Sequence, residues 1–196
     1  MAEASNEPNR PLTVDVDRWA PSASPEIAHQ LFEILDIVDQ NGALRRALTD
    51  PSRPAEDRAR LVHSLLDGRA HEVAVDIAAE LASQRSTTER QLGDALERTA
   101  VLVAAAATEN RGGGDALESL VDELIRFKSM LDRSAEVQSA FSDSRASAEA
   151  KVTLARRLST PGSEEAALLI ERAASEPRGA LPGRLLEQFA QWVADR

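Results

Sequence analysis

The stretch Leu31-Phe-Glu-Ile-Leu-Asp-Ile-Val-Asp39 is followed 93 positions later by Leu124-Ile-Arg-Phe-Lys-Ser-Met-Leu-Asp132, which places apolar residues in the same phase. The match extends without a gap from residues 29–103 to residues 122–196, a window of 75 positions with 13 identical pairs. In an Ala-rich chain this identity is modest, so the gapless register and the shared apolar pattern carry more weight. A repeated unit of this length is large enough to fold as a small domain. The sequence therefore predicts a tandem pair of domains and not a thin solenoid.

The composition of the chain favours helices. Of its 196 residues, 42% are apolar, while only 9 Gly and 9 Pro interrupt it and Tyr is absent. Ala, Leu, Glu and Arg, which dominate the sequence, are strong helix formers. The predicted fold class is all-α, with two tandem small helical bundles that share a long connecting helix.

Charge and cysteine content exclude several classes of function. A net charge of −10 disfavours attraction to nucleic-acid phosphates and to an anionic bilayer. The absence of Cys excludes disulfides, thiol catalysis and thiolate metal sites. The apolar run at residues 99–108 is about half of the roughly 20 residues that a transmembrane helix needs, and residues 1–10 lack the apolar stretch of a secretory signal. We expect a soluble, cytosolic-type protein without direct membrane insertion.

The chain divides into three predicted segments. Residues 1–23, with Pro8, Pro11 and Pro21 and no sustained apolar period, are expected to form a flexible tail in which Val16 and Trp19 dock loosely at most. Residues 24–94 and 95–196 are expected to form the two bundles.

Capping signals mark the predicted helices. Ser24-Pro25-Glu26 begins a helix that runs to about Gln40. The helix after Pro54 is expected to bury four residues, namely Leu61, Val62, Leu65 and Leu66. Thr88 and Gln91 are spaced as a capping box and open the long helix, which we expect to end at Arg111-Gly-Gly-Gly114.

No residue has the setting that catalysis needs. His29, His63 and His71 lack the i, i+4 spacing of a helical zinc site and are expected to be solvent-facing. The pairs Asp36/Asp39 and Asp15/Asp17 alternate with apolar residues, as solvent-facing carboxylates do. The sequence predicts no catalytic residue, no metal and no cofactor.

The glycine-rich and basic segments also have structural explanations. The glycines at residues 112–114 follow a helix and lack the Lys-Ser/Thr of a phosphate-binding loop, so they are interpreted as a linker. The pairs Arg45/Arg46, Arg58/Arg60 and Arg156/Arg157 are surrounded by acids and carry no interleaved aromatics. Ion pairs on helix faces are favoured over nucleic-acid binding.

Five stretches resemble one known family. They are Leu44-Arg-Arg-Ala-Leu-Thr-Asp-Pro-Ser52 with Pro54–Gly68, its second copy Val137–Ser144 with Ser147–Lys151, and Leu185-Leu-Glu-Gln-Phe-Ala190. The chain resembles the delta subunit of F-type ATP synthase, whose mitochondrial counterpart is the oligomycin-sensitivity-conferring protein. The resemblance is strongest to actinobacterial forms with a duplicated N-terminal helical domain, and it covers residues 26–196.

The resemblance implies a mechanical and non-catalytic role. In that family the subunit forms part of the peripheral stalk (stator), which links the alpha/beta catalytic head to the membrane-anchored b subunits during proton-driven ATP synthesis. The expected location is cytoplasmic, peripheral to the inner face of the cell membrane.

The resemblance also implies a partner site. The family's helical domain binds N-terminal helices of alpha subunits in a groove between its first and fifth helices, which correspond here to residues 95–108 and 163–175 of the second unit. The candidate groove residues are Val101, Ala104, Ala105, Ala166, Ile170 and Ala173. Small side chains suit a helix-in-groove contact, although an apolar stripe is equally typical of packing inside a bundle.

Two departures from the family pattern bear on this interpretation. The first unit shows no evident first helix, because residues 9–23 lack helical period. The family's C-terminal domain, which engages the b subunits, is missing, so the sequence is either a shortened piece of the family's chain or a natural short form.

Two other functions remain open at this point. A generic all-helical interaction or regulatory scaffold would share the same architecture. An enzyme or ligand-binding bundle is disfavoured, because the predicted core positions lack polar residues.

Overall fold

The computed structural model describes residues 11–196, and it is helical throughout this range without a strand. The all-α prediction is confirmed. The described chain divides into two compact units. The first comprises the described residues through Ser22 together with Glu26–Ala100, and the second comprises Ala23–Pro25 together with Val101–Arg196. The predicted division into bundles at residues 24–94 and 95–196 stays a prediction.

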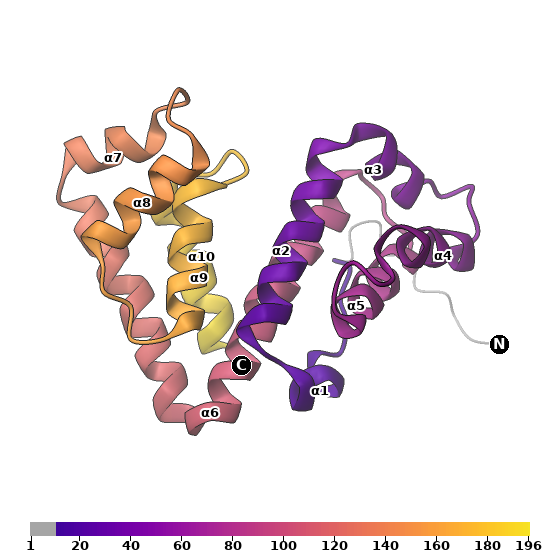
Figure 1. Cartoon of the computed structure of the whole chain (residues 1–196), viewed down its shortest axis with the longest axis horizontal. Coiled ribbons are helices and arrows are strands. Elements are labelled where there is room, and N and C mark those ends of the chain that lie inside the picture. The colour runs from indigo at the N-terminus through magenta and orange to yellow at the C-terminus, as the bar shows by residue number, and fades with distance from the viewer. Residues whose placement is uncertain (1–10) are drawn as a thin grey trace. The chain divides into compact units, whose positions relative to one another are not determined.

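The first unit begins with two short elements and continues with longer helices (Figure 1). They are α1 (Val16–Trp19), the 3-10 turn η1 (Ala20–Ser22), α2 (Pro25–Gln40), α3 (Gly42–Thr49), α4 (Ala55–Leu66), α5 (Glu72–Ser83) and the first part of α6 (Arg90–Asp132). Within this unit α4 packs against α3 and α5.

The second unit continues from α6. Its further helices are α7 (Ala135–Ser142), α8 (Ala148–Leu158), α9 (Glu164–Ser175) and α10 (Pro182–Ala194), with α9 packed against α8 and α10. Two residues inside α6 leave the helical conformation: Gly112 has φ −154° and ψ 18°, and Gly113 has φ 64° and ψ −155°. The positive φ of Gly113 favours a residue without a Cβ, and the ribbon reverses direction here (Figure 1). The predicted end of the long helix at the glycines is confirmed.

Helix bounds repeat at the spacing found in the sequence. Shifting α3 by 93 positions converts residues 42–49 into 135–142, which are the bounds of α7. The same shift moves α4 onto 148–159 and α5 onto 165–176, each within one residue of the bounds of α8 and α9. Differences of one residue lie within the uncertainty of any helix end.

The N-terminal capping contact of α3 recurs at the equivalent helix of the second unit. Asn41 Oδ1 accepts a hydrogen bond from the Leu44 amide at 3.0 Å, and Ser134 Oγ accepts one from the Val137 amide at 3.3 Å. These caps occupy equivalent positions at the starts of α3 and α7. Each satisfies an amide that the first helical turn leaves without a backbone partner.

Each unit buries equivalent side chains in its core. Leu31 and Leu124 are both fully buried, and the same holds for several other equivalent pairs. These pairs are Val38/Leu131, Leu48/Phe141, Ile77/Ile170, Leu92/Leu185 and Leu96/Phe189. In the second unit Phe127 and Phe141 meet edge to face, with ring centroids 6.3 Å apart. The equivalent residues of the first unit are the aliphatic Ile34 and Leu48.

Two expectations from the sequence are wrong. Residues 16–22 form α1 and η1 instead of an irregular tail, and Leu12 and Val16 are buried. The Gln84 amide group holds this segment, since it donates to the Thr13 carbonyl at 2.7 Å and accepts from the Thr13 amide at 3.1 Å. Residues 1–10 of the predicted tail lie outside the described range. Leu65, expected in the core, is 39% exposed.

Arg58 joins three segments of the first unit from a buried position. Its guanidinium donates hydrogen bonds to five backbone carbonyl groups, those of Ala82 (2.8 Å), Ser83 (2.8 Å), Gln84 (3.1 Å), Asp50 (3.3 Å) and Arg53. These carbonyls belong to the end of α5 and to the loop between α3 and α4. The expectation of an ion pair on a helix face is therefore wrong for Arg58. The planar guanidinium fork suits this task better than a single ammonium group, and the equivalent residue of the second unit is Lys151.

The two fully buried leucines at equivalent positions provide a test of the copied cores. We expect Leu31→Ala and Leu124→Ala each to lower the free energy of unfolding by about 2–5 kcal/mol, because each leaves a cavity among packed helices. Urea denaturation followed by circular dichroism measures the change. Leu181→Ala is the matched control, since Leu181 is 67% exposed and its truncation should change stability by no more than about 0.5 kcal/mol. A loss at only one of the buried positions would contradict equivalent cores.

Substitution of Arg58 tests whether its carbonyl contacts stabilise the first unit. Arg58→Lys should lower the free energy of unfolding by about 1–3 kcal/mol, because one ammonium group leaves buried carbonyls without donors. Lys151→Arg in the second unit is the reciprocal control and should change stability by about 0.5 kcal/mol or less. Equal stability of Arg58→Lys and the unmodified chain in urea would show that the buried network contributes nothing.

The loops after α3 and α7 predict a dependence of stability on pH. Hydrogen bonds from the Ser52 hydroxyl and amide lower the pKa of Asp50, and hydrogen bonds from the Arg145 side chain and amide lower the pKa of Asp143. A carboxyl whose pKa is lower in the folded state stabilises the fold above its unfolded pKa, about 3.9. This contribution is lost as the pH falls through the folded pKa.

The double variant Asp50→Asn/Asp143→Asn tests this linkage. It should be less stable than the unmodified chain at pH 7, and the difference should shrink as the pH falls below about 3.9. Urea denaturation across this pH range measures both chains. Asp122→Asn is the control, because it removes one carboxylate charge at an exposed position on α6, away from the two loops. A constant difference between the chains at all pH values would exclude a role for the two charges.

Candidate functional site

The six residues assigned to a partner groove lie on two helices of the second unit. Val101, Ala104 and Ala105 are on the first part of α6, and the other three, Ala166, Ile170 and Ala173, are on α9. Arg111 at the end of the first part of α6 pairs with Glu165 at the start of α9, with Nη2 and Oε2 3.1 Å apart. The structure therefore brings the two helices together at this end.

All six of these side chains are buried within the chain. A partner helix would reach them only after a packed element moved, or it would contact their half-buried neighbours such as Ala167 and Leu168 on α9. Small apolar residues of this kind also let helices of one bundle approach closely. Their contact with a partner stays a prediction.

The histidines lie apart and have structural contacts. His29 Nδ1 is 3.8 Å from Glu33 on α2, as expected for a solvent-facing residue. His63 lies between Asp67 (3.1 Å) and Asp76 (3.9 Å), which links α4 to α5. Within residues 11–196 no group of His, Asp and Glu is arranged to hold a metal ion.

His71 is exposed, as expected, and it also caps the start of α5. Its Nδ1 accepts a hydrogen bond from the Val73 amide at 3.2 Å, and its own amide donates to Gln30 Oε1 on α2 at 2.6 Å. Asp15 has a similar role, since its Oδ1 accepts from the Asp17 amide at 3.2 Å at the start of α1. These contacts assign both residues to local structure and not to acid–base chemistry.

Ion pairs account for two of the basic clusters, as predicted. The Arg45 side chain pairs with Glu89 at 3.3 Å and donates to the Asp39 carbonyl at 2.9 Å. Arg156 contacts both carboxylate oxygens of Glu171, at 2.6 and 2.9 Å. The pKa of Arg156 is raised by this hydrogen bonding to Glu171. Both arginines therefore join helices within one unit.

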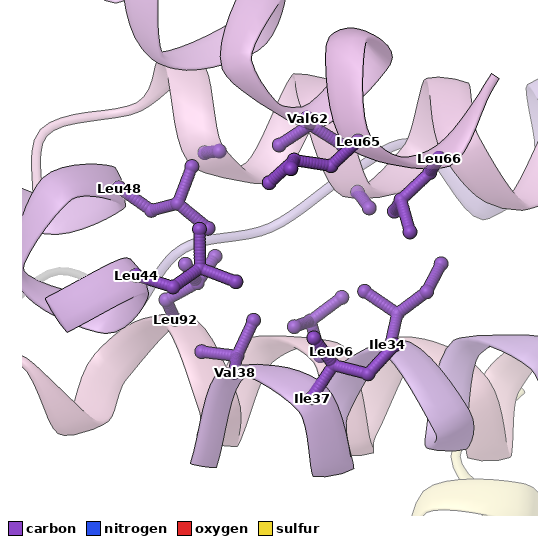
Figure 2. A pocket seen from close by; sticks show the side chains of 12 residues that line it. Ile34, Ile37, Val38, Leu44, Leu48, Val62, Leu65, Leu66, Leu92 and Leu96 are labelled. Carbon is purple, nitrogen blue, oxygen red and sulfur yellow. The ribbon is translucent and has the colours of Figure 1, made fainter. Parts of the chain in front are cut away.

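The first unit contains an apolar hollow between α2 and α4 (Figure 2). Its volume is about 30 Å³, and every lining side chain is apolar. The lining residues are Ile34, Ile37, Val38, Leu44, Leu48, Val62, Leu65, Leu66, Ala78, Ala82, Leu92 and Leu96. Figure 2 shows that the side chains from α2, α3 and α4 point toward one common space. Such a site lacks groups for catalysis and is suited to contact with an apolar side chain.

Two residues leave the hollow partly open to solvent. Ile37 on α2 is 47% exposed and Leu65 on α4 is 39% exposed. The sequence contained a signal for this surface. Ile34, Leu35, Ile37 and Val38 make the apolar stripe of α2 wider than a single core-facing row needs, so one edge of the stripe extends beyond the core.

The second unit has a larger groove at the equivalent place. It measures about 250 Å³ and is lined by residues that include Arg126, Phe127, Met130 and Leu158. Met130 and Leu158 are the equivalents of Ile37 and Leu65. Both units therefore have a hollow between the helices equivalent to α2 and α4, apolar in the first unit and lined in the second also by Glu123, Arg126, Ser159 and Thr160.

No family model matches the chain. Curated relatives named ATP synthase subunit delta match it from end to end. The protein from Kocuria rhizophila is 86% identical over 196 residues, the one from Renibacterium salmoninarum is 42% identical over 197, and the one from Arthrobacter sp. is 41% identical over 201. Each alignment covers 100% of this chain and 73% of the relative. The chain therefore belongs to the family of ATP synthase subunit delta, as the repeated helical motifs predicted.

Proposed function

We propose that the chain is a non-catalytic subunit of the ATP synthase peripheral stalk, which links the alpha/beta catalytic head to the b subunits during proton-driven ATP synthesis. The observation that carries this proposal is the 86% identity over the whole chain to a protein named ATP synthase subunit delta. This identity favours the stalk over an unrelated helical scaffold.

The described fold suits a mechanical role. A stalk component must keep its shape under load, and each unit here has a buried apolar core with capped helices. The helical part of α6 before Gly112 carries the chain from the first unit into the second without an intervening loop. Buried apolar surface is the main source of stability in such bundles.

The proposed partners are the N-terminal helices of alpha subunits and the b subunits. For alpha we propose the groove named from the sequence, at α6 and α9 of the second unit. Arg111 and Glu165 support this choice, because their ion pair fixes the two helices side by side. Contact with the b subunits is proposed for the part of the family's length beyond the 73% that this chain spans.

The proposed location is the cytoplasmic side of the cell membrane, at its inner face within the complex. Among the described residues, no helix combines the length and the apolar character that crossing a membrane requires. The link to the membrane in this proposal comes from the other subunits of the synthase.

Binding to a catalytic head tests the proposed function. The chain is mixed with an alpha/beta head from Kocuria rhizophila ATP synthase that lacks its own delta subunit, and the mixture is separated by size-exclusion chromatography. We expect the chain to co-elute with the head while the rate of ATP hydrolysis by the head stays unchanged, because a linker holds the head without entering its chemistry. Removal of the N-terminal segments of alpha from the head should abolish co-elution.

Isotope-labelled chain locates the contact by NMR. A peptide with the N-terminal sequence of the alpha subunit should shift amide signals on the first part of α6 and on α9. Failure of the intact head to bind would overturn the stalk proposal. Binding of the head with shifts only elsewhere would keep the stalk proposal and refute the six groove residues.

A further inference from the structure

A short segment at the start of the described chain is attached to the first unit by few buried side chains. We call this segment, residues 11–22, the strap. Leu12 and Val16 are buried, and every other residue of the strap is half-buried or exposed. Its helical parts, α1 and η1, have only four and three residues. A single turn has little stability of its own, because several residues must be fixed for its first hydrogen bond. The strap therefore owes its conformation to docking on the bundle.

Polar contacts hold the strap at the end of α5. The Gln84 side chain makes the two hydrogen bonds with the Thr13 backbone described above. The Gln84 carbonyl is itself bound by Arg58, so this attachment point belongs to the packed bundle. Arg18 Nη1 lies 3.6 Å from Glu80 Oε2, and these side chains are 65% and 35% exposed. Because exposed ion pairs contribute little to stability, Gln84 is the stronger of these two attachments.

The indole of Trp19 makes docking of the strap less favourable. Its Nε1 is buried and has no hydrogen-bond partner within residues 11–196. A buried donor without an acceptor has lost its hydrogen bond to water and gained none in return. Arg18 lies over the Trp19 ring, 4.7 Å from the centroid, but this cation belongs to the strap itself and does not attach it to the bundle.

The second unit has a continuous helix at the corresponding place in the repeat. When the shift of 93 positions is continued, residues 11–18 correspond to residues 104–111, which belong to the first part of α6. Residues 104–108 are all buried, whereas only Leu12 is buried among their equivalents, residues 11–15. The first unit thus has a lightly attached segment where the second has a packed helix.

A shared arginine supports this correspondence. Arg18 is the equivalent of Arg111, and α5 is the equivalent of α9. Arg18 pairs with Glu80 near the end of α5, and Arg111 pairs with Glu165 at the start of α9. Both arginines therefore contact a glutamate on the equivalent helix, although at opposite ends of it. The strap is in this sense a short counterpart of the first part of α6.

We propose that the strap is a lid that opens while the rest of the first bundle stays folded. Segments with few buried apolar side chains and exposed hydrogen bonds open locally, at a lower free energy than the core. Opening breaks the contact between Gln84 and Thr13, exposes Leu12 and Val16, and returns the indole N–H of Trp19 to water. The device thereby switches apolar side chains of the first unit between hidden and accessible states. It does not rest on the proposed function.

Native-state hydrogen exchange of the full chain, followed by NMR, tests independent opening. The amides of Thr13 and Arg18 are hydrogen-bonded in the closed state. They should exchange at least about a hundredfold faster than the amide of Ile77 in the middle of α5. Their rates should depend little on urea, because opening of the strap exposes little surface. Exchange of all three amides at one rate with one urea dependence would show a single cooperative unit and overturn the proposal. So would exchange of Thr13 as fast as in an unfolded peptide, since no closed state would then exist.

Substitution of Gln84 identifies the attachment. Gln84→Ala removes both hydrogen bonds to Thr13, so the strap amide of Arg18 should exchange about tenfold faster, while the exchange of Ile77 stays unchanged. Gln138→Ala is the matched control, because the Gln138 side chain donates to a backbone carbonyl of the second unit at 3.0 Å. It should leave the exchange of the strap unchanged. Unchanged exchange of Arg18 in Gln84→Ala, or equal acceleration of Arg18 and Ile77, would refute a lid held by Gln84.

Fluorescence of Trp19 gives a second measurement of the same opening. Trp192→Phe leaves Trp19 as the only tryptophan of the chain. In this background Gln84→Ala should move the emission maximum to longer wavelength before the bundle unfolds in urea, as circular dichroism records it. A change of emission that coincides with loss of helical signal in both chains would show that the strap and the bundle open together, and would overturn the proposal.

Discussion

The continuity of α6 constrains the whole chain, because one helix must provide residues to two units. Its first residues, including Leu92 and Leu96, are buried in the position that Leu185 and Phe189 of α10 occupy in the second unit, so this part closes the first bundle as α10 closes the second. The same helix then continues past the boundary at Ala100 and Val101. A helix of this kind has to stop before it can pack on itself. Gly112 and Gly113 provide the stop, and the positive φ of Gly113 costs least without a Cβ.

The duplication preserved local hydrogen bonding more faithfully than core composition. The caps at Asn41 and Ser134 use different side chains for the same amide, and the loops at Asp50 and Asp143 repeat the same carboxylate contact. The core positions changed from Ile34, Leu48 and Leu96 to three phenylalanines. A cap depends on one hydrogen bond with fixed geometry, whereas a core tolerates exchange among apolar residues when its total volume is filled.

The sequence predicted those features that depend on local chemistry. The signal Ser24-Pro25-Glu26 placed the start of α2, and the glycines placed the break in α6. It could not predict the clamp at Arg58, because the carbonyls that bind it lie up to 26 residues away and are brought there by packing of α4 on α5. A four-residue helix such as α1 has no period to detect, and the amide group that holds its segment belongs to Gln84. The family resemblance pointed to the small residues of α6 and α9, and their apolar pattern did not distinguish a bundle interior from a partner groove.

In a duplicated bundle, surface charge can change with little effect on folding stability. Replacing Glu33 by its equivalent Arg126 leaves Leu31 and Leu124 equally buried, because exposed charges contribute little to stability. The same replacement alters which partner is attracted and which is repelled, since like charges across an interface are costly and opposite charges speed association. Copies of one fold can therefore acquire separate partners without a conflict between binding and folding.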